Sequence, residues 1–274
     1  MRLLSILFLL GLLSGCNMTE PTAPPMPEWR ALFDGETTAG WVNYNSDTIR
    51  DGWKVEDGAL VIDGPGGDIV TVDEFQDFEL ELEWQVSEAG NSGIFYNVVD
   101  GLGAVYSSGP EMQVLDNTGH GDGKNPLTSA GACYALYAPP RDVTRPVGEW
   151  NEVRLISRGG EVEHWLNGTL LCRYTLGSDE WNALVAASKF KDMPEFGLSR
   201  HGRIALQDHG DRVAFRNIRI REFVNEASTA ELVAATCICG TPEAAMEGCA
   251  CPQCMGGEGG PESPDCVCDP IQVE

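Results

Sequence analysis

The segment Phe78–Val86 constrains the fold of this chain most strongly. Its sequence, FELELEWQV, alternates apolar and polar residues, so Phe78 and every second residue after it share one face, while the other face carries Glu79, Glu81, Glu83 and Gln85. A period of two is typical of a strand with one face on a core. The segment therefore predicts a half-buried strand, and its row of glutamates predicts a solvated outer face.

Similar short strands are predicted along most of the chain, with turns between them. They cover residues 53–62 (two strands around an Asp-Gly turn), 91–99, the stretch from Glu111, and 150–156, 161–166, 170–176, 203–207 and 212–221. The exception is a helix over residues 179–190, which Ser178 can cap and whose positive end suits Asp179 and Glu180. Many short antiparallel strands with one short helix predict an all-β, two-sheet sandwich.

The N-terminus has the features of a processing signal. Arg2 precedes the apolar run Leu3–Leu13, which is too short to span a membrane and ends in a Leu-Ser-Gly-Cys sequence that looks like a bacterial lipobox. We expect residues 1–16 to form the lipoprotein signal, with Cys16 lipidated, and residues 17–28 to form a Pro-rich tether. The residue after the lipobox cysteine is Asn17 and not Asp, and in this respect the sequence resembles outer-membrane lipoproteins. A lipid-anchored protein on the periplasmic side or surface of the outer membrane is predicted.

Charge and cysteines set further limits. The chain has 42 acidic and 18 basic residues, a net charge of −24, so no nucleic-acid partner is expected. Residues 224–274 lack Lys and Arg and hold seven of the ten cysteines. In an oxidising compartment they predict an irregular, acidic, Cys-rich tail that is disulfide-stapled or disordered. Their C-x-C and C-x-x-C spacings leave a soft-metal site for Zn or Cu(I) as an alternative.

The densest group of chemically active side chains lies between Glu111 and His120. In a strand, Glu111 and Gln113 point to the same face, whereas Asp116 would face the opposite way unless a bulge shifted the pleat. Two carboxylates on one face suit acid–base chemistry, metal binding or both. The alternative for each residue alone is a solvated polar position at a strand end.

Several segments together resemble the 3-keto-disaccharide hydrolase domain family, over roughly residues 29–223. The segments are Leu32–Gly35 with Gly40-Trp41, Asn91–Phe95, Glu111–Asn117, Gly148–Asn151, His164–Gly168, Phe190–Pro194, Ile204–Gly210 and Phe215–Ile218. The resemblance implies a concanavalin A-like jelly roll whose concave face binds carbohydrate, with an oligosaccharide or glycoside as substrate. It also implies hydrolase or lyase action on 3-keto-glycosides, by C2 deprotonation, β-elimination and hydration.

Such chemistry needs a base, an acid and an electropositive group, which a divalent metal can supply. We expect no nucleotide cofactor. The candidate catalytic residues are Glu111, His120 and His209; the candidate metal ligands are Glu111, Asp116 and His120; the candidate substrate-binding residues are Gln113, Asn117, Lys124 and Gln207. The ordinary alternatives are surface and turn positions, including an Asx turn for Asp208 and a core or edge position for His164.

Two other functions fit part of the pattern. A retaining, glucanase-type glycosidase would use Glu111 and Asp116 with their carboxyl groups roughly 5 Å apart. A non-catalytic, lectin-like surface lipoprotein would only bind carbohydrate. The family often carries Arg where this chain has Asn97, so substrate recognition is expected to differ there.

Overall fold

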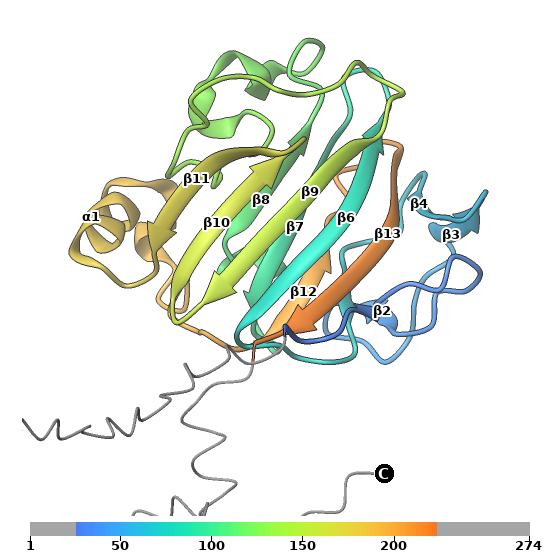
Figure 1. Cartoon of the computed structure of the whole chain (residues 1–274), viewed down its shortest axis with the longest axis horizontal. Helices are drawn as coiled ribbons and strands as arrows, with labels where there is room; N and C mark the ends of the chain where they lie inside the picture. The colour runs from blue at the N-terminus through green and yellow to red at the C-terminus, as the bar shows by residue number, and fades with distance from the viewer. Residues whose placement is uncertain (1–25, 224–274) are drawn as a thin grey trace, which may run out of the picture.

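The computed structural model describes residues 26–223, which form two antiparallel sheets packed face to face (Figure 1). The strands are β1 (Arg30–Ala31), β2 (Trp41–Asn43), β3 (Trp53–Glu56), β4 (Ala59–Ile62), β5 (Ile69–Thr71), β6 (Phe78–Val86), β7 (Asn91–Val98), β8 (Glu111–Leu115), β9 (Asn151–Arg158), β10 (Glu161–Leu166), β11 (Thr169–Thr175), β12 (Arg203–Leu206) and β13 (Val213–Glu222). The larger sheet has the order β11-β10-β9-β6-β13-β4-β3, with β1 also on β13; the smaller has the order β2-β5-β12-β7-β8. The predicted all-β sandwich is confirmed.

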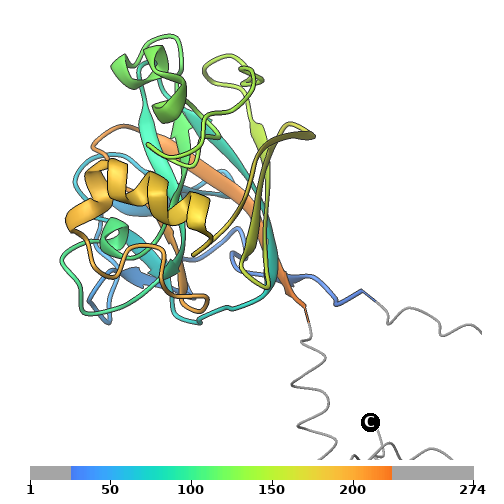
Figure 2. The ribbon, with the colours of Figure 1, turned by 90° about the vertical axis from the view of Figure 1, so that its left-hand side faces the viewer.

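Strand β6 lies near the middle of the larger sheet, as its alternating sequence requires. Phe78, Leu80, Leu82 and Trp84 are at most 2% exposed and pack against the smaller sheet. Removing a large apolar side chain from water stabilises a fold by about 1.5–3 kcal/mol. The inward face of β6 therefore accounts for a large share of the contact between the two layers, which Figure 2 shows edge-on.

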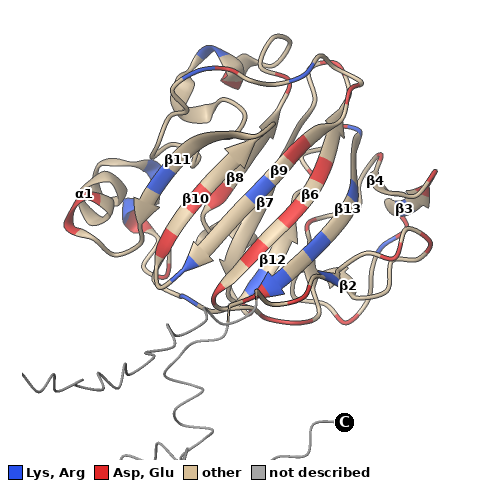
Figure 3. Ribbon diagram, in the orientation of Figure 1, with Lys and Arg blue, Asp and Glu red and all other residues tan. Residues whose placement is uncertain are grey.

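The outward glutamates of β6 are not the solvated row that the sequence predicts. Glu81 pairs with Arg219 and Glu83 with Arg216, at 2.5 and 2.7 Å. Glu79 is 2% exposed and pairs with both Arg154 and Arg221. Figure 3 shows the resulting alternation of acidic and basic residues across β9, β6 and β13. The arginines come from neighbouring strands that are distant in sequence, which is why the pattern of β6 alone does not reveal them.

Replacing Glu79 with Gln is expected to lower the free energy of unfolding by about 2 kcal/mol, because two guanidinium groups lose their buried counter-charge. Glu81→Gln is the matched control on the same strand; its exposed pair should contribute about 0.5 kcal/mol. Urea denaturation of both variants measures the difference. Equal losses for the two variants would contradict the buried ion-pair network.

The predicted helix is shorter than expected. Helix α1 covers Asp179–Ala187, and the Ser178 hydroxyl accepts a hydrogen bond from Trp181 N, as predicted. The Ser188 hydroxyl accepts from Phe190 N and begins a separate 3₁₀ turn, η4 (Lys189–Asp192). A second capping residue thus ends the helix before residue 190. This break places Lys189 at the first position of η4.

The long loop over residues 117–140 is ordered against the edge of β8. It contains two 3₁₀ turns, η2 (Gly121–Lys124) and η3 (Pro126–Thr128). Its later part hydrogen-bonds to β8: Tyr134 N donates to Glu111 O, and Gly131 N donates to Gln113 O, at 3.0 and 2.8 Å. The loop therefore covers an exposed strand edge and brings Tyr134 next to Glu111.

His164 lies in the core. It is fully buried, and its Nε2 lies 2.9 Å from the hydroxyl of Tyr174, while its Nδ1 lies 3.2 Å from the carbonyl of Gly131. Burial lowers the pKa of His164 to about 4, so the ring is neutral. The core interpretation of this residue is confirmed.

Several predictions fall outside the described residues. The lipidation site Cys16, most of the tether and the Cys-rich segment 224–274 belong to this group, so lipid anchoring, soft-metal binding and localisation stay predictions. Between residues 26 and 223, no helix is long and apolar enough to cross a membrane.

Candidate active site

The candidate site lies on the outer face of the smaller sheet, where Glu111 begins β8. Met112 and Val114 point into the core, so Glu111 and Gln113 point away from it. Across the sheet, Glu111 is opposite Phe95 of β7, and Gln113 is opposite Gly93. On the other side of Gly93 lies Gln207, whose backbone N–H donates to Gly93 O at 3.0 Å. Glu111 and Gln113 of β8, and Gln207 directly after β12, thus lie on the two sides of β7 and form one polar patch.

Gly93 makes room for the Glu111 carboxyl group. A Cβ atom at residue 93 would lie 2.9 Å from Cδ and 3.0 Å from Cγ of Glu111, and it would overlap Oε1. The carboxyl group therefore lies across the backbone of β7, in the space that a side chain would otherwise fill. The backbone φ angle of Gly93 is not in the left-handed region, so the backbone conformation alone does not require glycine. The glycine is needed for this close approach.

The environment of Glu111 favours a protonated carboxyl group. Burial raises its pKa to about 8; the charge of Lys189 opposes this shift, and Asp68 and Asp122 add to it. Within the described part of the chain, no group donates a hydrogen bond to this carboxyl. A buried, unpaired carboxyl that titrates near neutral pH is suited to proton transfer.

Lys189, Tyr134 and Asp122 form a wall beside Glu111. The Lys189 ammonium lies 4.0 Å from the centre of the Tyr134 ring, and the Tyr134 hydroxyl donates to Asp122 Oδ2 at 3.1 Å. Partial desolvation lowers the pKa of Lys189, against the attraction of Glu111 and Asp122. The wall supplies a cation near the carboxyl group, from the end of the predicted helix over residues 179–190, where sequence patterns assigned Lys189 no role.

Two amide oxygens beside Glu111 have no partner. The Oε1 atoms of Gln113 and Gln207 are buried, and no hydrogen bond to either is found among residues 26–223. Gln113 Nε2 donates to Thr128 O at 3.2 Å, which fixes the side chain. A buried acceptor without a donor costs stability unless water or a ligand satisfies it. Both amides therefore suit the predicted binding of sugar hydroxyls.

The two predicted histidines lie together at one end of the patch. The rings of His120 and His209 are 6.1 Å apart and edge-to-face. His120 Nδ1 accepts from Asp122 N, and its Nε2 lies 3.5 Å from Asn91 Nδ2. His209 is exposed and lies near Asp68. Burial raises the pKa of Asp68, and the interaction with His209 opposes this shift.

Asp116 does not join Glu111, and the predicted bulge is absent from the continuous β7–β8 register. Asp116 follows the strand, and its carboxylate accepts hydrogen bonds from Ala89 N and Thr118 N at 2.8 and 2.9 Å. Burial opposes the shift, but backbone N–H groups hold the pKa of Asp116 below its usual value. Asp116 is thus a structural cap, and the glucanase-type pair of acids is not formed.

The predicted metal ligands do not fit a metal ion. Among residues 26–223, no three His, Cys, Asp or Glu side chains converge as a ligand set. Asp116 is bound to backbone, and His120 uses Nδ1 to cap η2. Three converging ligands are the minimum of most protein metal centres.

The remaining candidates have structural or undefined roles. Asn117 Oδ1 accepts from Ala130 N and holds the long loop, and Lys124 is exposed in η2. Asp208 accepts from Gly210 N, as an Asx turn does, and also from Gly66 N and Gly67 N. Asn97 adopts φ +55° in a bulge of β7, and neither polar atom of its buried amide has a partner among the described residues.

Comparison with known proteins identifies the family. The model of the 3-keto-alpha-glucoside-1,2-lyase-like domain matches residues 28–221. The chain belongs to this family. A curated relative from Bacteroides thetaiotaomicron, named 3-keto-disaccharide hydrolase, is 38% identical over 223 residues, which cover 69% of this chain and 77% of the relative. The prediction of an enzyme with a hydrolase-type activity is confirmed.

Solved structures of similar proteins share the fold of this chain. A candidate glycosyl hydrolase from Parabacteroides distasonis is 35% identical, with a TM-score of 0.68, and the match covers 72% of this chain and 94% of that protein. A second protein of the same description and organism is 28% identical, with a TM-score of 0.56, over 72% and 100% of the two chains. The jelly-roll type of sandwich is therefore shared with them.

Sequence reasoning missed the groups that define the surroundings of Glu111. Lys189 and Asp68 come from two separate segments, and Tyr134 and Asp122 both come from the long loop over residues 117–140. No local motif marks the role of any of the four. The family resemblance was the one signal that could have indicated two of the residues around Glu111. Gly93 lies within the segment Asn91–Phe95, and Lys189 directly precedes the segment Phe190–Pro194.

Proposed function

We propose that this protein cleaves glycosides whose sugar carries a ketone at C3, and that Glu111 is the base that removes the C2 proton. The observation that carries the proposal is the buried Glu111 carboxyl beside Lys189, with a pKa of about 8. Membership of the lyase-like family and the relative named 3-keto-disaccharide hydrolase support the substrate class.

The residues divide the chemistry as follows. Glu111 takes the C2 proton, and the electron pair moves to the C3 oxygen as an enediolate, which the Lys189 ammonium stabilises. The bond from C1 to the leaving oxygen then breaks, and His209 protonates that oxygen. Water adds to C1 of the resulting enone and a proton returns to C2, which releases the free 3-keto sugar. Lys189 thus supplies the electropositive group, whereas Lys124, a predicted substrate-binding residue, is exposed in η2.

Turnover in D₂O tests this reaction. A 3-keto disaccharide should be cleaved with deuterium at C2 of the product, while its unoxidised parent is unchanged. A control without enzyme corrects for exchange of the product itself. Cleavage without C2 deuterium would indicate direct glycosidic displacement, and binding without cleavage would indicate a lectin.

The role of His209 as the acid is tested with two leaving groups. His209→Asn should lose much activity on a substrate with a sugar leaving group, and much less on one with an aryl leaving group of low pKa, which needs no protonation. Equal losses on the two substrates would remove His209 as the acid.

The charges around Glu111 predict opposite pH effects for two variants. Lys189 lowers the pKa of Glu111 and Asp122 raises it. The rising limb of kcat/KM against pH, expected near the Glu111 pKa of about 8, should therefore move to higher pH in Lys189→Met and to lower pH in Asp122→Asn. Asn retains the hydrogen bond from Tyr134. Shifts in the same direction would remove Glu111 as the group that titrates.

Metal assistance and location remain separate proposals. Measuring activity after treatment with a chelator, and again after divalent metals are added back, tests metal assistance. This test does not depend on the predicted ligands Glu111, Asp116 and His120, which do not converge.

We also propose a lipid anchor at Cys16. Membrane fractionation of cells expressing Cys16→Ser should show its release from the membrane; retention would contradict the anchor.

A further inference from the structure

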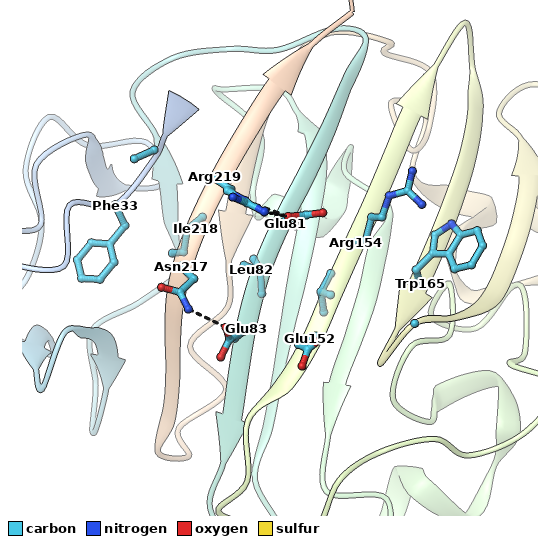
Figure 4. Close-up of a pocket in the computed structure, with 13 residues that line it drawn as sticks. Phe33, Glu81, Leu82, Glu83, Glu152, Arg154, Trp165, Asn217, Ile218 and Arg219 are labelled. Atoms are coloured by element: carbon cyan, nitrogen blue, oxygen red, sulfur yellow. Dashed lines mark hydrogen bonds and ion pairs between the residues drawn. The ribbon is translucent and has the colours of Figure 1, made fainter. Parts of the chain in front are cut away.

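A groove of about 700 Å³ lies on the outer face of the larger sheet, on the opposite layer from Glu111 (Figure 4). It extends between Phe33 at one side and Trp165 at the other. One cross-strand row passes through it over β10, β9, β6 and β13, and consists of Trp165, Arg154, Glu81 and Arg219. Its volume lies within the range of small-molecule sites.

The aromatic wall of this groove is held in place. Trp165 Nε1 donates to Glu163 at 2.6 Å, and the Arg154 guanidinium lies 5.4 Å from the centre of the Trp165 ring. Arg154 is fixed in turn by its ion pair with the buried Glu79. A ring that is already oriented loses little conformational entropy when a ligand binds to it.

Polar atoms with unused hydrogen-bonding capacity face this groove. Arg219 directs both Nε and Nη2 to Oε2 of Glu81, so Glu81 Oε1 has no partner within residues 26–223. Asn217 Nδ2 donates to Glu83, and Asn217 Oδ1 accepts no hydrogen bond from the described residues. Arg154 donates to Glu79 through Nε, and its Nη atoms donate no hydrogen bond to those residues. The groove therefore offers both donors and acceptors, as a ligand rich in hydroxyl groups requires, because each hydroxyl donates and accepts.

The groove is nearly neutral within a strongly acidic protein. Each lining carboxylate of Glu81, Glu83 and Glu152 pairs with an arginine, which is Arg219, Arg216 and Arg145 respectively. Compensated charge gives neither a cation nor a phosphate a strong site. An aromatic wall with planar carboxylate, guanidinium and amide groups suits a neutral ligand that has both apolar faces and hydroxyls.

We propose that this groove is a second carbohydrate-binding site, which holds a neutral oligosaccharide chain on the face opposite to Glu111. The site is separate from the proposed reaction. It retains a neutral glycan at the protein while the other sheet face remains open to the oxidised sugar.

Affinity gel electrophoresis of the full chain in gels with soluble neutral polysaccharides tests this proposal. The probes are a β-1,3-glucan, a cellulose ether and a starch, with pectin as the anionic comparison. At least one neutral polymer should retard the wild type. Trp165→Ala should weaken that binding about tenfold or more, as loss of an aromatic anchor does. Ala31→Trp, at an exposed position lining the groove, should block it by bulk.

Trp150→Ala is the matched control, since the Arg216 guanidinium carbon lies 4.0 Å from the centre of the Trp150 ring and Trp150 does not line the groove. This variant and Glu111→Gln should bind polymer as the wild type does, and Trp165→Ala should cleave a small 3-keto disaccharide normally. The proposal is overturned if no neutral polymer retards the wild type, if only pectin does, or if Trp165→Ala and Ala31→Trp bind normally. Self-association of the wild type lost in Trp165→Ala would instead assign the face to a second copy of the chain.

Discussion

Replacing Glu111 with Gln is expected to lower kcat/KM for a 3-keto disaccharide by about 10²–10⁴-fold, the usual contribution of a positioned acid–base group. Gln keeps the size of the side chain and its contact with Gly93, but it cannot take a proton from C2. Steady-state kinetics measures the loss, and exchange of the substrate C2 proton in D₂O should fall with it.

The same variant should change how stability depends on pH. The folded protein holds the Glu111 proton up to a pKa of about 8, above the ordinary value of 4.5. Between these values the folded state binds more protons than the unfolded state, so Glu111 makes stability fall as pH rises. Glu111→Gln should flatten this slope in urea denaturation. An unchanged slope together with unchanged activity would show that Glu111 is an ordinary strand carboxylate.

Replacing Gly93 with Ala is expected to lower kcat by about 10²-fold while the protein remains folded, since displacement of a reacting group by about 1 Å has this effect. The backbone of residue 93 accepts alanine, but the new methyl group would occupy the position of the Glu111 carboxyl. Gly121→Ala is a matched control, because a Cβ there meets no atom within 4 Å. Kinetics and thermal unfolding of both variants separate the effects.

A double-mutant cycle identifies the route of the Gly93 effect. If Gly93 acts through Glu111, adding Gly93→Ala to Glu111→Ala should cause almost no further loss, because the displaced carboxyl is already gone. Multiplied losses would show that the methyl group disturbs the substrate or the sheet by another route. Gly93 would then be a binding position rather than a positioning residue for Glu111.

Local chemistry in the sequence determined most of the strands. The alternation of β6 sets which residues face the core, and the Asp57-Gly58 and Asn167-Gly168 turns carry the positive φ angles that tight hairpins need. Three short strands escaped prediction, β1, β2 and β5, because two or three residues do not establish a period of two. Helix α1 was predicted too long because the capping role of Ser188 depends on how the chain turns after it.

For the site, the sequence determined that Glu111 and Gln113 share a face. It also determined that Gln207 and His209 lie in one segment, Ile204–Gly210, that resembles the family. The tertiary structure alone decided that Asp116 is bound by the backbone of Ala89, that Lys189 lies beside Glu111, and that the glutamates of β6 are paired. The physical reason is that the alternation of side chains is a local property of a strand. Burial, charge and hydrogen bonding are set by neighbours that only the folded chain brings together.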